Sequence, residues 1–199
     1  MARIRAQDYD EKRNSILKNA ALLFADKGFA GASMSQLATH CNVSKATLYH
    51  YYSNKEAILF DVLFKHIEHL KNDLAKVNLA DKSPEDRLFL AVDALLKSYE
   101  DADDTHRALI NDLQILPIED RRKIKIGERE IVVFFTEIII SNKPSLNDTP
   151  EKAMPLTMSL LGMLNWHYTW FKQDGPMTRQ DYSKLACDLF LGGLNSSKI

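Results

Sequence analysis

Apolar residues recur with helical spacing along almost the whole chain. The first stripe, with apolar side chains at i, i+1, i+4, i+5 and i+8, predicts a helix over residues 10–27. Its members are Ile16, Leu17, Ala20, Ala21 and Phe24. Gly28 follows directly, and glycine there accepts the left-handed conformation that ends many helices. Strand-like alternation is nearly absent, so the pattern predicts an all-α fold of about nine helices.

Capping residues and prolines mark where the other helices start. Ser33 with Gln36 three positions later forms a capping box, and Ser53 with Glu56 repeats it. Ser83 precedes a proline suited to the first helical position. Further helices are therefore expected over residues 33–41, 44–50, 53–74, 83–103, 105–116, 117–141, 149–172 and 178–193.

The two short helices near the N-terminus form a recognisable unit. They are joined by Asn42-Val43 and follow a longer helix, which is the order of a helix-turn-helix. Ala38 is small enough for the helices to cross closely, and Asn42 tolerates the positive φ of a tight turn. The sequence thus predicts an N-terminal three-helix helix-turn-helix domain over residues 1–56. A larger helical domain for ligand binding and dimerisation is expected over residues 57–199.

The second short helix carries hydrogen-bonding side chains on the face opposite Leu48. Groups of these kinds bond to phosphates or to base edges, and here they belong to Ser44, Lys45, Thr47, Tyr49 and His50. Lys55 lies in the first turn of the next helix, where free N–H groups favour an anion. Tyr52, four residues after Leu48, is expected to pack its ring inside. An alternative interpretation is that the tyrosines only cover the junction between the small domain and the long helix.

Residues 16–59 carry the most specific motif of the chain, ILKNAALLFADKGFAGASMSQLATHCNVSKATLYHYYSNKEAIL. Through the helix end at Lys27-Gly28-Phe29, the Val43-Ser44-Lys45 corner and Lys55-Glu56, this segment resembles the DNA-binding region of the TetR family of repressors, without a gap. Asn42 stands where the family usually has glycine, and it can still adopt the turn. Tyr51 stands where many members have histidine, and its hydroxyl can serve the same phosphate.

The resemblance implies an all-helical homodimer that reads a palindromic operator in two successive major grooves of double-stranded DNA. The positions that match contact positions of the family are Ser33, Ser44, Lys45, Thr47, Tyr49, His50, Tyr51 and Lys55. Among them, Lys45 and Thr47 are expected to read bases, while the tyrosine hydroxyls and Lys55 contact phosphates. Binding should therefore weaken steeply with salt.

Charge and composition agree with a nucleic-acid face at one end only. The net charge is −1, but residues 1–60 hold eight basic and five acidic residues, whereas the rest hold 18 and 22. A swing of this size also arises by chance. Cys41 and Cys187 are the only cysteines, which fits a reducing compartment. No signal peptide or membrane-spanning stretch is visible, so a cytoplasmic protein without a membrane partner is expected.

The larger domain is expected to hold a small hydrophobic inducer. Asn165 interrupts an apolar helical face, and a lone amide there can fix a ligand carbonyl, although a satisfied core asparagine is the competing interpretation. The candidate ligand-binding residues are Tyr99, Phe134, Met158, Leu161, Asn165 and Trp166. The N-W-x-Y-x-W-F string followed by Gly-Pro resembles a subgroup of TetR regulators tied to acyl-CoA, phenylacetate or steroid-ring catabolism. That resemblance implies a coenzyme A thioester as inducer.

The last two predicted helices are the most apolar, and in the family they pair with their copies across a two-fold axis. The candidates for that dimer contact are Leu160, Leu164, Phe171, Leu185, Leu189 and Phe190; an intramolecular core is an equal alternative for each. In this reading the long helix from Ser53 links ligand pocket and DNA-binding domain, and its tilt would set the spacing of the recognition helices.

No catalytic pattern is present, so the chain is not expected to be an enzyme. No cofactor is expected. His66 and His69 have a spacing that can chelate a metal, but no third ligand is evident and no metal site is expected. The prediction is a ligand-responsive transcriptional regulator, acting as a repressor. The alternatives are a repressor of the same fold that senses multiple drugs or aromatic compounds, and a helical adaptor that binds protein.

Overall fold

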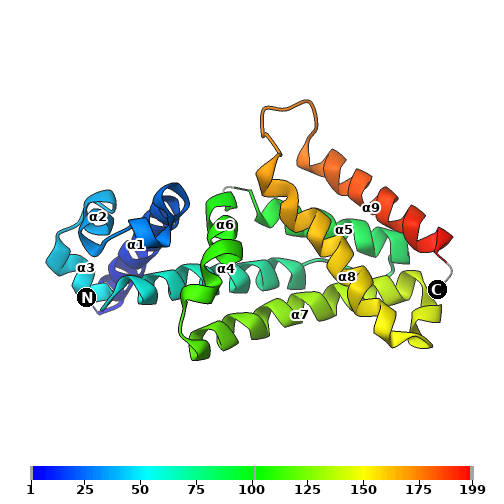
Figure 1. Cartoon of the computed structure of the whole chain (residues 1–199), viewed down its shortest axis with the longest axis horizontal. Coiled ribbons are helices and arrows are strands. Elements are labelled where there is room, and N and C mark those ends of the chain that lie inside the picture. Colours follow the sequence, from blue (N-terminus) through cyan, green and yellow to red (C-terminus); the bar gives the residue numbers. More distant parts are fainter. Residues whose placement is uncertain (1, 101, 198–199) are drawn as a thin grey trace. The chain divides into compact units, whose positions relative to one another are not determined.

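The computed structural model describes residues 2–100 and 102–197, with side chains from residue 8 onward. Those residues form nine α-helices and no strand, which confirms the all-α prediction (Figure 1). The helices are α1 (Ala2–Gly31), α2 (Met34–His40), α3 (Lys45–Tyr51), α4 (Lys55–Ala75), α5 (Pro84–Ser98), α6 (Asp103–Asp112), α7 (Ile118–Asn142), α8 (Pro150–Asn165) and α9 (Arg179–Ser196). Short 3-10 turns cover Leu113–Ile115, Pro144–Asn147 and Trp166–Thr169.

The helices are grouped into two compact units. The first unit holds the chain up to Ile67 together with the segment that ends at Lys125, and the second holds Glu68–Glu100 and the segment from Ile126 onward. Both α4 and α7 contribute residues to each unit. No single point of the chain separates the units, and the functional division between residues 56 and 57 stays a prediction.

The apolar stripe of α1 is buried as expected, but the helix is longer than its stripe. Helical structure begins at Ala2, eight residues before the predicted start, because polar residues with good helix propensity continue the helix outward. Gly28 interrupts the helix with φ of +70° and ψ of 157°. The positive φ confirms the expected use of glycine, whereas the extended ψ differs from a left-handed helix end and is accessible essentially to glycine alone. The ring of Phe29 then packs on that of Phe24, with centroids 5.4 Å apart.

The predicted capping box at the start of α2 is confirmed, whereas the one predicted at the start of α4 is wrong. Ser33 Oγ accepts from the Gln36 backbone N–H at 3.2 Å, while Gln36 Oε1 accepts from the Ser33 N–H at 2.9 Å. Before α4 the cap is Asn54, whose Oδ1 accepts from the Ala57 N–H at 2.8 Å. The Ser53–Glu56 box was therefore the wrong choice. Asparagine and serine cap equally well, so sequence alone does not decide between adjacent candidates.

Three predicted helix ends were too late or too early because tertiary contacts decide them. α5 ends at Ser98, since the next residue turns to place a buried phenol against α8. α8 ends at Asn165, where His167 inserts its ring between those of Phe171 and Tyr182 and the backbone tightens into a 3-10 turn. α9 continues past the Gly192-Gly193 pair to Ser196. There Lys143 Nζ donates to the Leu194 and Ser197 carbonyls, both at 2.7 Å, and satisfies the helix end.

Replacing Ser83 with alanine should lower the free energy of unfolding by about 1 kcal/mol, since an N-cap serine satisfies a helix N–H that alanine leaves open. Ser83 Oγ accepts from the Asp86 N–H at 3.1 Å at the start of α5. Urea unfolding followed by circular dichroism measures the change. Ser83→Asn, which caps equally well, is the matched control and should stay within a few tenths of a kcal/mol of wild type. An alanine variant as stable as wild type would show that the Ser83 cap does not stabilise the fold.

In the second unit α9 packs along α5 (Figure 1), and Ala186, Cys187, Phe190 and Leu194 are buried on its inner face. Large apolar side chains are exposed on α8, on the 3-10 turn that follows it and on α9: Met154, Met158, Trp166, Leu185 and Leu189. No helix of the described residues has the length and apolar character to cross a membrane.

Candidate nucleic-acid interface

The turn between α2 and α3 is built as the sequence predicted. Asn42 adopts a φ of +51°, and the Val43 N–H returns to the Ala38 carbonyl at 3.0 Å. Ala38 is buried, as are Leu37 on α2 and Leu48 on α3. The two helices therefore meet through small and apolar side chains, and their polar sides turn outward.

The exposed side of α3 carries the predicted contact residues. Lys45 and His50 are exposed, Tyr49 is 48% exposed, and Thr47 and Tyr51 are half-buried. Leu48, on the opposite side of the helix, is completely buried. A seven-residue helix whose outward side holds an ammonium, a hydroxyl, an imidazole and phenols is chemically suited to base edges and phosphates.

Several of these groups are preorganised by contacts with one another. Ser44 Oγ caps α3 by accepting from the Thr47 N–H at 2.9 Å. The hydroxyls of Ser44 and Thr47 also form a hydrogen bond with each other, with the oxygens 2.7 Å apart. Lys45 Nζ lies 6.0 Å from the centroid of the Tyr49 ring, within the range of a cation–π interaction. The side chains expected to read bases are thus held near the start of the helix, and each keeps hydrogen-bonding capacity for an additional partner.

Lys55 has a structural role that the sequence did not reveal. Its Nζ donates to the Phe29 and Ala32 carbonyls at 3.0 and 3.1 Å and lies 4.3 Å from the centroid of the Phe29 ring. These contacts tie the start of α4 to the connection between α1 and α2. An ammonium has three donors, so one remains for a phosphate. Ser33 likewise serves as the cap of α2, and a contact of either residue with DNA stays a prediction.

An open hollow of about 460 Å³ lies where the starts of α2 and α4 meet α3. Its lining residues are Ala32, Ser33, Met34, Ser35, Lys45, Tyr49, Ser53, Asn54, Lys55 and Glu56. The positive end of the α4 dipole, two ammonium groups and several hydroxyls face this space, against one carboxylate. Lys45 and Lys55, both expected to contact DNA, line this hollow. Its geometry therefore suits a phosphate of the DNA backbone.

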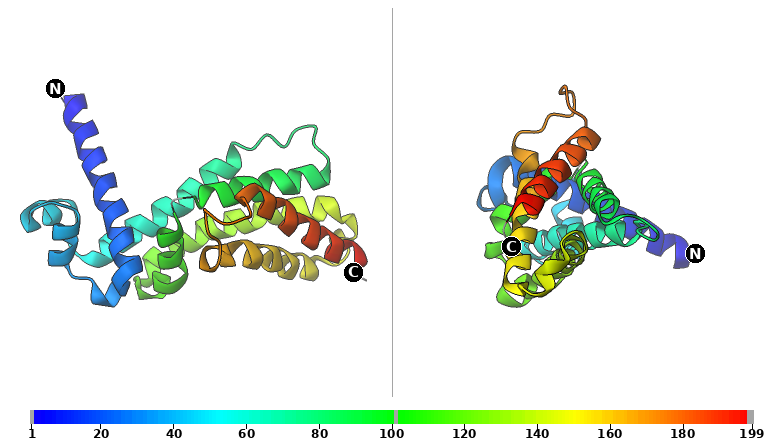
Figure 2. Two further views of the ribbon diagram at one scale, coloured as in Figure 1. Left: turned by 90° about the horizontal axis from the view of Figure 1, so that it is seen from above. Right: turned by 90° about the vertical axis from the view of Figure 1, so that its right-hand side faces the viewer.

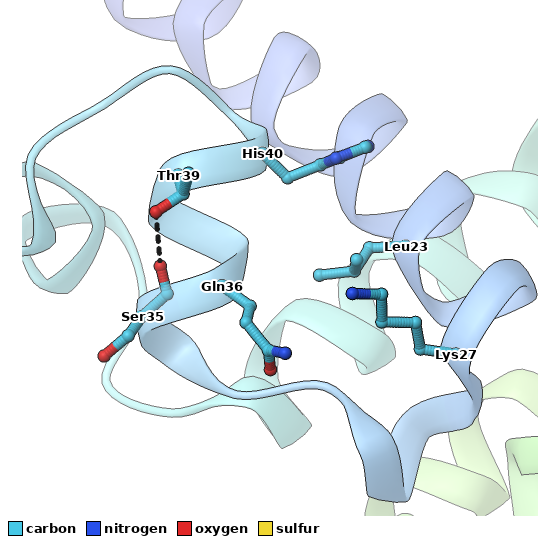
Figure 3. Close-up of a pocket in the computed structure, with 6 residues that line it drawn as sticks. All are labelled: Leu23, Lys27, Ser35, Gln36, Thr39 and His40. Carbon is cyan, nitrogen blue, oxygen red and sulfur yellow. Dashed lines mark hydrogen bonds between the residues drawn. The ribbon is translucent and has the colours of Figure 1, made fainter.

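A second hollow, of about 320 Å³, lies between α1 and α2 (Figure 3). Leu23 and Lys27 point into it from α1, while Gln36 and His40 point into it from α2. Ser35 lines both hollows, and its carbonyl accepts from Thr39 Oγ1 at 3.1 Å. Lys27 contributes an ammonium to this second hollow, and no carboxylate lines it.

Tyr52 packs inside, as predicted, and anchors the end of α3. Its ring is buried and its hydroxyl donates to Asp61 Oδ2 at 2.8 Å. Arg13 of α1 forms an ion pair with the same carboxylate. Burial raises the pKa of the Tyr52 phenol well above its usual value, and the hydrogen bond to the ionised Asp61 adds to this. The phenol therefore stays protonated, and this polar network joins α1, α4 and the end of α3 within the first unit.

A further contact with α3 was missed by the sequence reasoning. The ring of Tyr9 on α1 stacks on that of Tyr51, with centroids 4.6 Å apart and an interplanar angle of 25°. Tyr9 also meets His50 edge-on at 6.4 Å. Tyr9 precedes the predicted start of the first helix, and no local pattern connects residues 42 positions apart.

The predicted ligand-binding residues are only partly brought together. In the second unit, Tyr99 is buried and its hydroxyl donates to Asn165 Oδ1 at 2.7 Å, while Leu161 is buried one turn earlier on α8. Burial raises the pKa of the Tyr99 phenol, which therefore remains a donor. Met158 and Trp166 are 51% and 62% exposed and lie outside this buried contact.

The positions of Phe134 and of two histidines concern the predicted ligand site and the metal site that the sequence did not favour. Phe134, the remaining ligand candidate, is half-buried on α7 with its ring edge-on to Phe135. His66 faces His106 at 3.4 Å, whereas His69 pairs with Asp73 at 3.2 Å, so the two histidines do not converge on one point. Within the described part of the chain, no group of three or more His, Cys, Asp or Glu is placed to hold a metal ion.

The dimer candidates divide into two sets. Leu160, Leu164 and Phe190 are buried within the second unit, as the core alternative proposed, and Phe171 is half-buried. Leu185 and Leu189 remain 41% and 62% exposed. Burial in a single chain was not separable by sequence from burial in a dimer, because both require apolar side chains at helical spacing.

Comparison with known proteins matches both parts of the chain to family models. The model described as "Bacterial regulatory proteins, tetR family" matches residues 16–62. The model described as "Tetracyclin repressor-like, C-terminal domain" matches residues 81–194. The first covers the helix-turn-helix, and the second covers more than half of the chain.

Individual relatives cover nearly the full length. The HTH-type transcriptional activator FasR of Mycolicibacterium smegmatis is 22% identical, over 94% of this chain and 84% of FasR. A crystal structure of a TetR-family transcriptional regulator from Bordetella parapertussis is 31% identical, with a TM-score of 0.86 over 94% of this chain and 98% of that one. The crystal structure of AibR in complex with isovaleryl coenzyme A and operator DNA is 27% identical, with a TM-score of 0.74 over 91% and 96%.

Proposed function

Because the chain belongs to the TetR family of bacterial transcriptional regulators, we propose that it is a repressor that binds a palindromic operator as a homodimer and leaves it when a small hydrophobic inducer binds. A regulator of this family is not an enzyme. The observation that carries the proposal is the outward side of α3, where Lys45, Thr47 and Tyr49 are open to a partner while Leu48 is buried. A repressor that binds chromosomal DNA would act in the cytoplasm.

The division of labour on DNA follows from the side-chain chemistry. Lys45 and Thr47 lie in the first turn of α3, and their donors can reach base edges in the major groove. Tyr49, Tyr51 and Lys55 offer hydroxyl and ammonium donors to phosphates, and the hollow around Lys55 adds the positive end of the α4 dipole. His50, Ser44 and Ser33 complete the proposed contact set.

The proposed dimer is supported by the exposed apolar residues on α8, on the 3-10 turn that follows it and on α9. These residues, Met154, Met158, Trp166, Leu185 and Leu189, define the α8–α9 face. Large apolar side chains at successive helical turns on two neighbouring helices are costly to leave in water, and a second copy of the same face satisfies the two-fold symmetry of a palindrome. Met158 and Trp166 are thus better placed for the dimer contact than for the ligand.

A gel-shift experiment on the DNA upstream of the gene for this chain tests the proposal. We expect a retarded complex whose affinity falls by about 10-fold or more between 50 and 200 mM salt, because Lys55 of each copy is proposed to neutralise one phosphate and Lys45 adds positive charge. Fluorescence anisotropy with labelled DNA measures the slope. Scrambled DNA of equal length is the control. Absence of retardation at low salt would favour the alternative of a protein-binding adaptor.

A coenzyme A thioester is the proposed inducer. AibR, which shares 27% of its residues with this chain, was crystallised with isovaleryl coenzyme A and operator DNA. In this chain the Tyr99 hydroxyl donates to Asn165 Oδ1. The N–H groups of the Asn165 amide can therefore donate to the carbonyl oxygen of a thioester. The long α4 helix, which contributes to both units, is the proposed coupling element. A multidrug or aromatic inducer is the second candidate, favoured by the apolar Leu161 beside the amide.

Asn165→Leu should weaken binding of an acyl-CoA by about 10-fold, as expected for the loss of one buried hydrogen bond to a ligand. Operator affinity in the absence of ligand should stay unchanged, because Asn165 belongs to the second unit whereas α3 belongs to the first. Isothermal titration with acyl-CoA thioesters of increasing chain length measures the first quantity. Tyr99→Phe is the matched control, since it frees the amide without removing it. Equal thioester affinity of wild type and Asn165→Leu would exclude the amide from the ligand site.

A further inference from the structure

The start of α1 forms an aromatic contact with the last turn of the recognition helix. Figure 2 shows the N-terminal turns of α1 projecting away from the other helices of the first unit in both views. Tyr9 lies in this part of the helix, and its ring stacks on Tyr51 at 4.6 Å and meets His50 at 6.4 Å. The ring of His50 in turn meets Tyr51 edge-on at 5.5 Å. The three rings form one cluster, which we name the Tyr9–His50–Tyr51 cluster.

The cluster adds a partner for Tyr51 outside the segment that matches the DNA-binding family model. That match begins at residue 16, so Tyr9 belongs to the extension of α1 that this chain places before it. Tyr51 is also the position where the chain departs from the histidine common in the family. The ring that departs from the pattern is therefore the one that Tyr9 covers.

The Tyr9–Tyr51 stack lies at the C-terminal end of α3. Tyr51 is the last residue of α3, and the final turn of a short helix lacks part of its internal hydrogen bonding. Tyr52 is fixed on the inner side by Asp61, which also pairs with Arg13 of α1. Tyr9 supplies the corresponding support on the outer side, one turn before Arg13 on the same helix. α1 thus contacts Tyr51, the last residue of α3, through Tyr9, and the C-cap residue Tyr52 through Arg13, which lies 5.9 Å from the centroid of the Tyr52 ring.

We propose that Tyr9 is a positioning residue for operator binding, which holds the rings of Tyr51 and His50 in place before DNA arrives. This inference rests on the proposed function and deepens it. Tyr9 acts through its ring: an offset stack restricts the rotamers of Tyr51, so less side-chain freedom is lost when its hydroxyl meets a phosphate. The partner concerned is the sugar-phosphate backbone of the operator, and the effect is independent of base sequence.

The expected effect follows from the strength of an aromatic pair. Removing the ring with Tyr9→Ala should lower operator affinity by roughly 2- to 12-fold per half-site, and by up to roughly 5- to 150-fold for both half-sites of a palindrome. The loss should be of similar size on specific and on scrambled DNA. Tyr9→Phe keeps the ring and should bind like wild type. In a Tyr51→Ala background, Tyr9→Ala should cause a clearly smaller loss, because only the edge-on contact with His50 remains.

The experiment combines anisotropy titrations of Tyr9→Ala, Tyr9→Leu, Tyr9→Phe, Tyr51→Ala and the Tyr9→Ala/Tyr51→Ala double variant with an NMR measurement on the DNA-free protein. Loss of the stacked ring should shift the aromatic proton signals of Tyr51 in Tyr9→Ala and leave them in place in Tyr9→Phe. Thermal unfolding of each variant identifies any general loss of folding; Tyr9→Leu, which retains apolar bulk without a π face, is the second ring-deleted variant.

The outcomes are separable. Wild-type affinity in Tyr9→Ala and Tyr9→Leu overturns the positioning role while leaving the proposed function intact. A loss in Tyr9→Phe as large as in Tyr9→Ala assigns the effect to the hydroxyl and overturns the role of the ring. A loss that persists fully in the Tyr51→Ala background overturns the connection through Tyr51. A wild-type chain that binds no DNA overturns the proposed function and the positioning role together, even if the Tyr51 signals move as expected.

Discussion

Leu189→Glu should convert the protein into a folded monomer that binds operator DNA at least about 100-fold more weakly than wild type, since linkage of two half-site contacts is worth a factor of 10² to 10⁴. Leu189 is 62% exposed on α9 and belongs to the α8–α9 face together with Leu185 and Met158. In a two-fold contact the same residue enters from both copies, so the substitution places two like charges in one apolar interface. Burial of an unpaired carboxylate there costs several kcal/mol, enough to dissociate a dimer at micromolar concentration.

Analytical ultracentrifugation measures the dissociation, and anisotropy titrations with a full palindrome and with a single half-site measure its consequence. The variant should bind the half-site as wild type does and lose only the gain from the second half. Ile118→Glu is the matched control, because Ile118 is 66% exposed on α7 and lies outside the α8–α9 face. A Leu189→Glu variant that remains a dimer would locate the dimer contact elsewhere.

Lys45→Ala should lower affinity for the operator by about 10-fold or more per half-site and should also blur the preference for the operator over scrambled DNA, since a good contact to a base edge discriminates by about 1–3 kcal/mol. Lys45 is exposed in the first turn of α3, and its ammonium is held over the Tyr49 ring at 6.0 Å. Because the Lys45 side chain is exposed, its removal should leave folding nearly unchanged.

Competition titrations against operator and scrambled DNA at constant salt separate the two effects. Lys18→Ala is the matched control, since it removes the same charge from an exposed site on α1 and should lower affinity little. Lys55→Ala gives the contrasting pattern: affinity for all sequences should fall together, with some loss of stability because Lys55 ties the Phe29 and Ala32 carbonyls to α4. An operator preference that survives in Lys45→Ala would assign base reading to other residues.

The local features of the DNA-binding part were predictable because they arise from neighbouring residues. The capping box at Ser33, the positive φ of Asn42 and the inward ring of Tyr52 each depend on positions within a few residues, and all three were predicted. The same is true of the outward side of α3, since burial of Leu48 leaves Lys45 and Tyr49 on the opposite side of a helix.

Errors appear where a distant residue competes with the local pattern. The end of α8 depends on the packing of His167 between two rings, and the end of α9 depends on Lys143 from another helix. The exposure of Met158 and Trp166 was also unpredictable, because apolar residues at helical spacing suit a pocket, a core or a dimer face equally well.

The sequence alone determined that the chain is helical, that a helix-turn-helix lies near its start, and which residues of α3 are turned outward, because helix periodicity and capping are local. The tertiary structure alone decided that Lys55 donates to the Phe29 and Ala32 carbonyls, that the Tyr99 hydroxyl donates to Asn165, and that the Tyr9 ring stacks on Tyr51. Those contacts join residues between 23 and 66 positions apart. Such pairs form only when whole helices pack, and the free energy of that packing is shared among many side chains rather than encoded in any one segment.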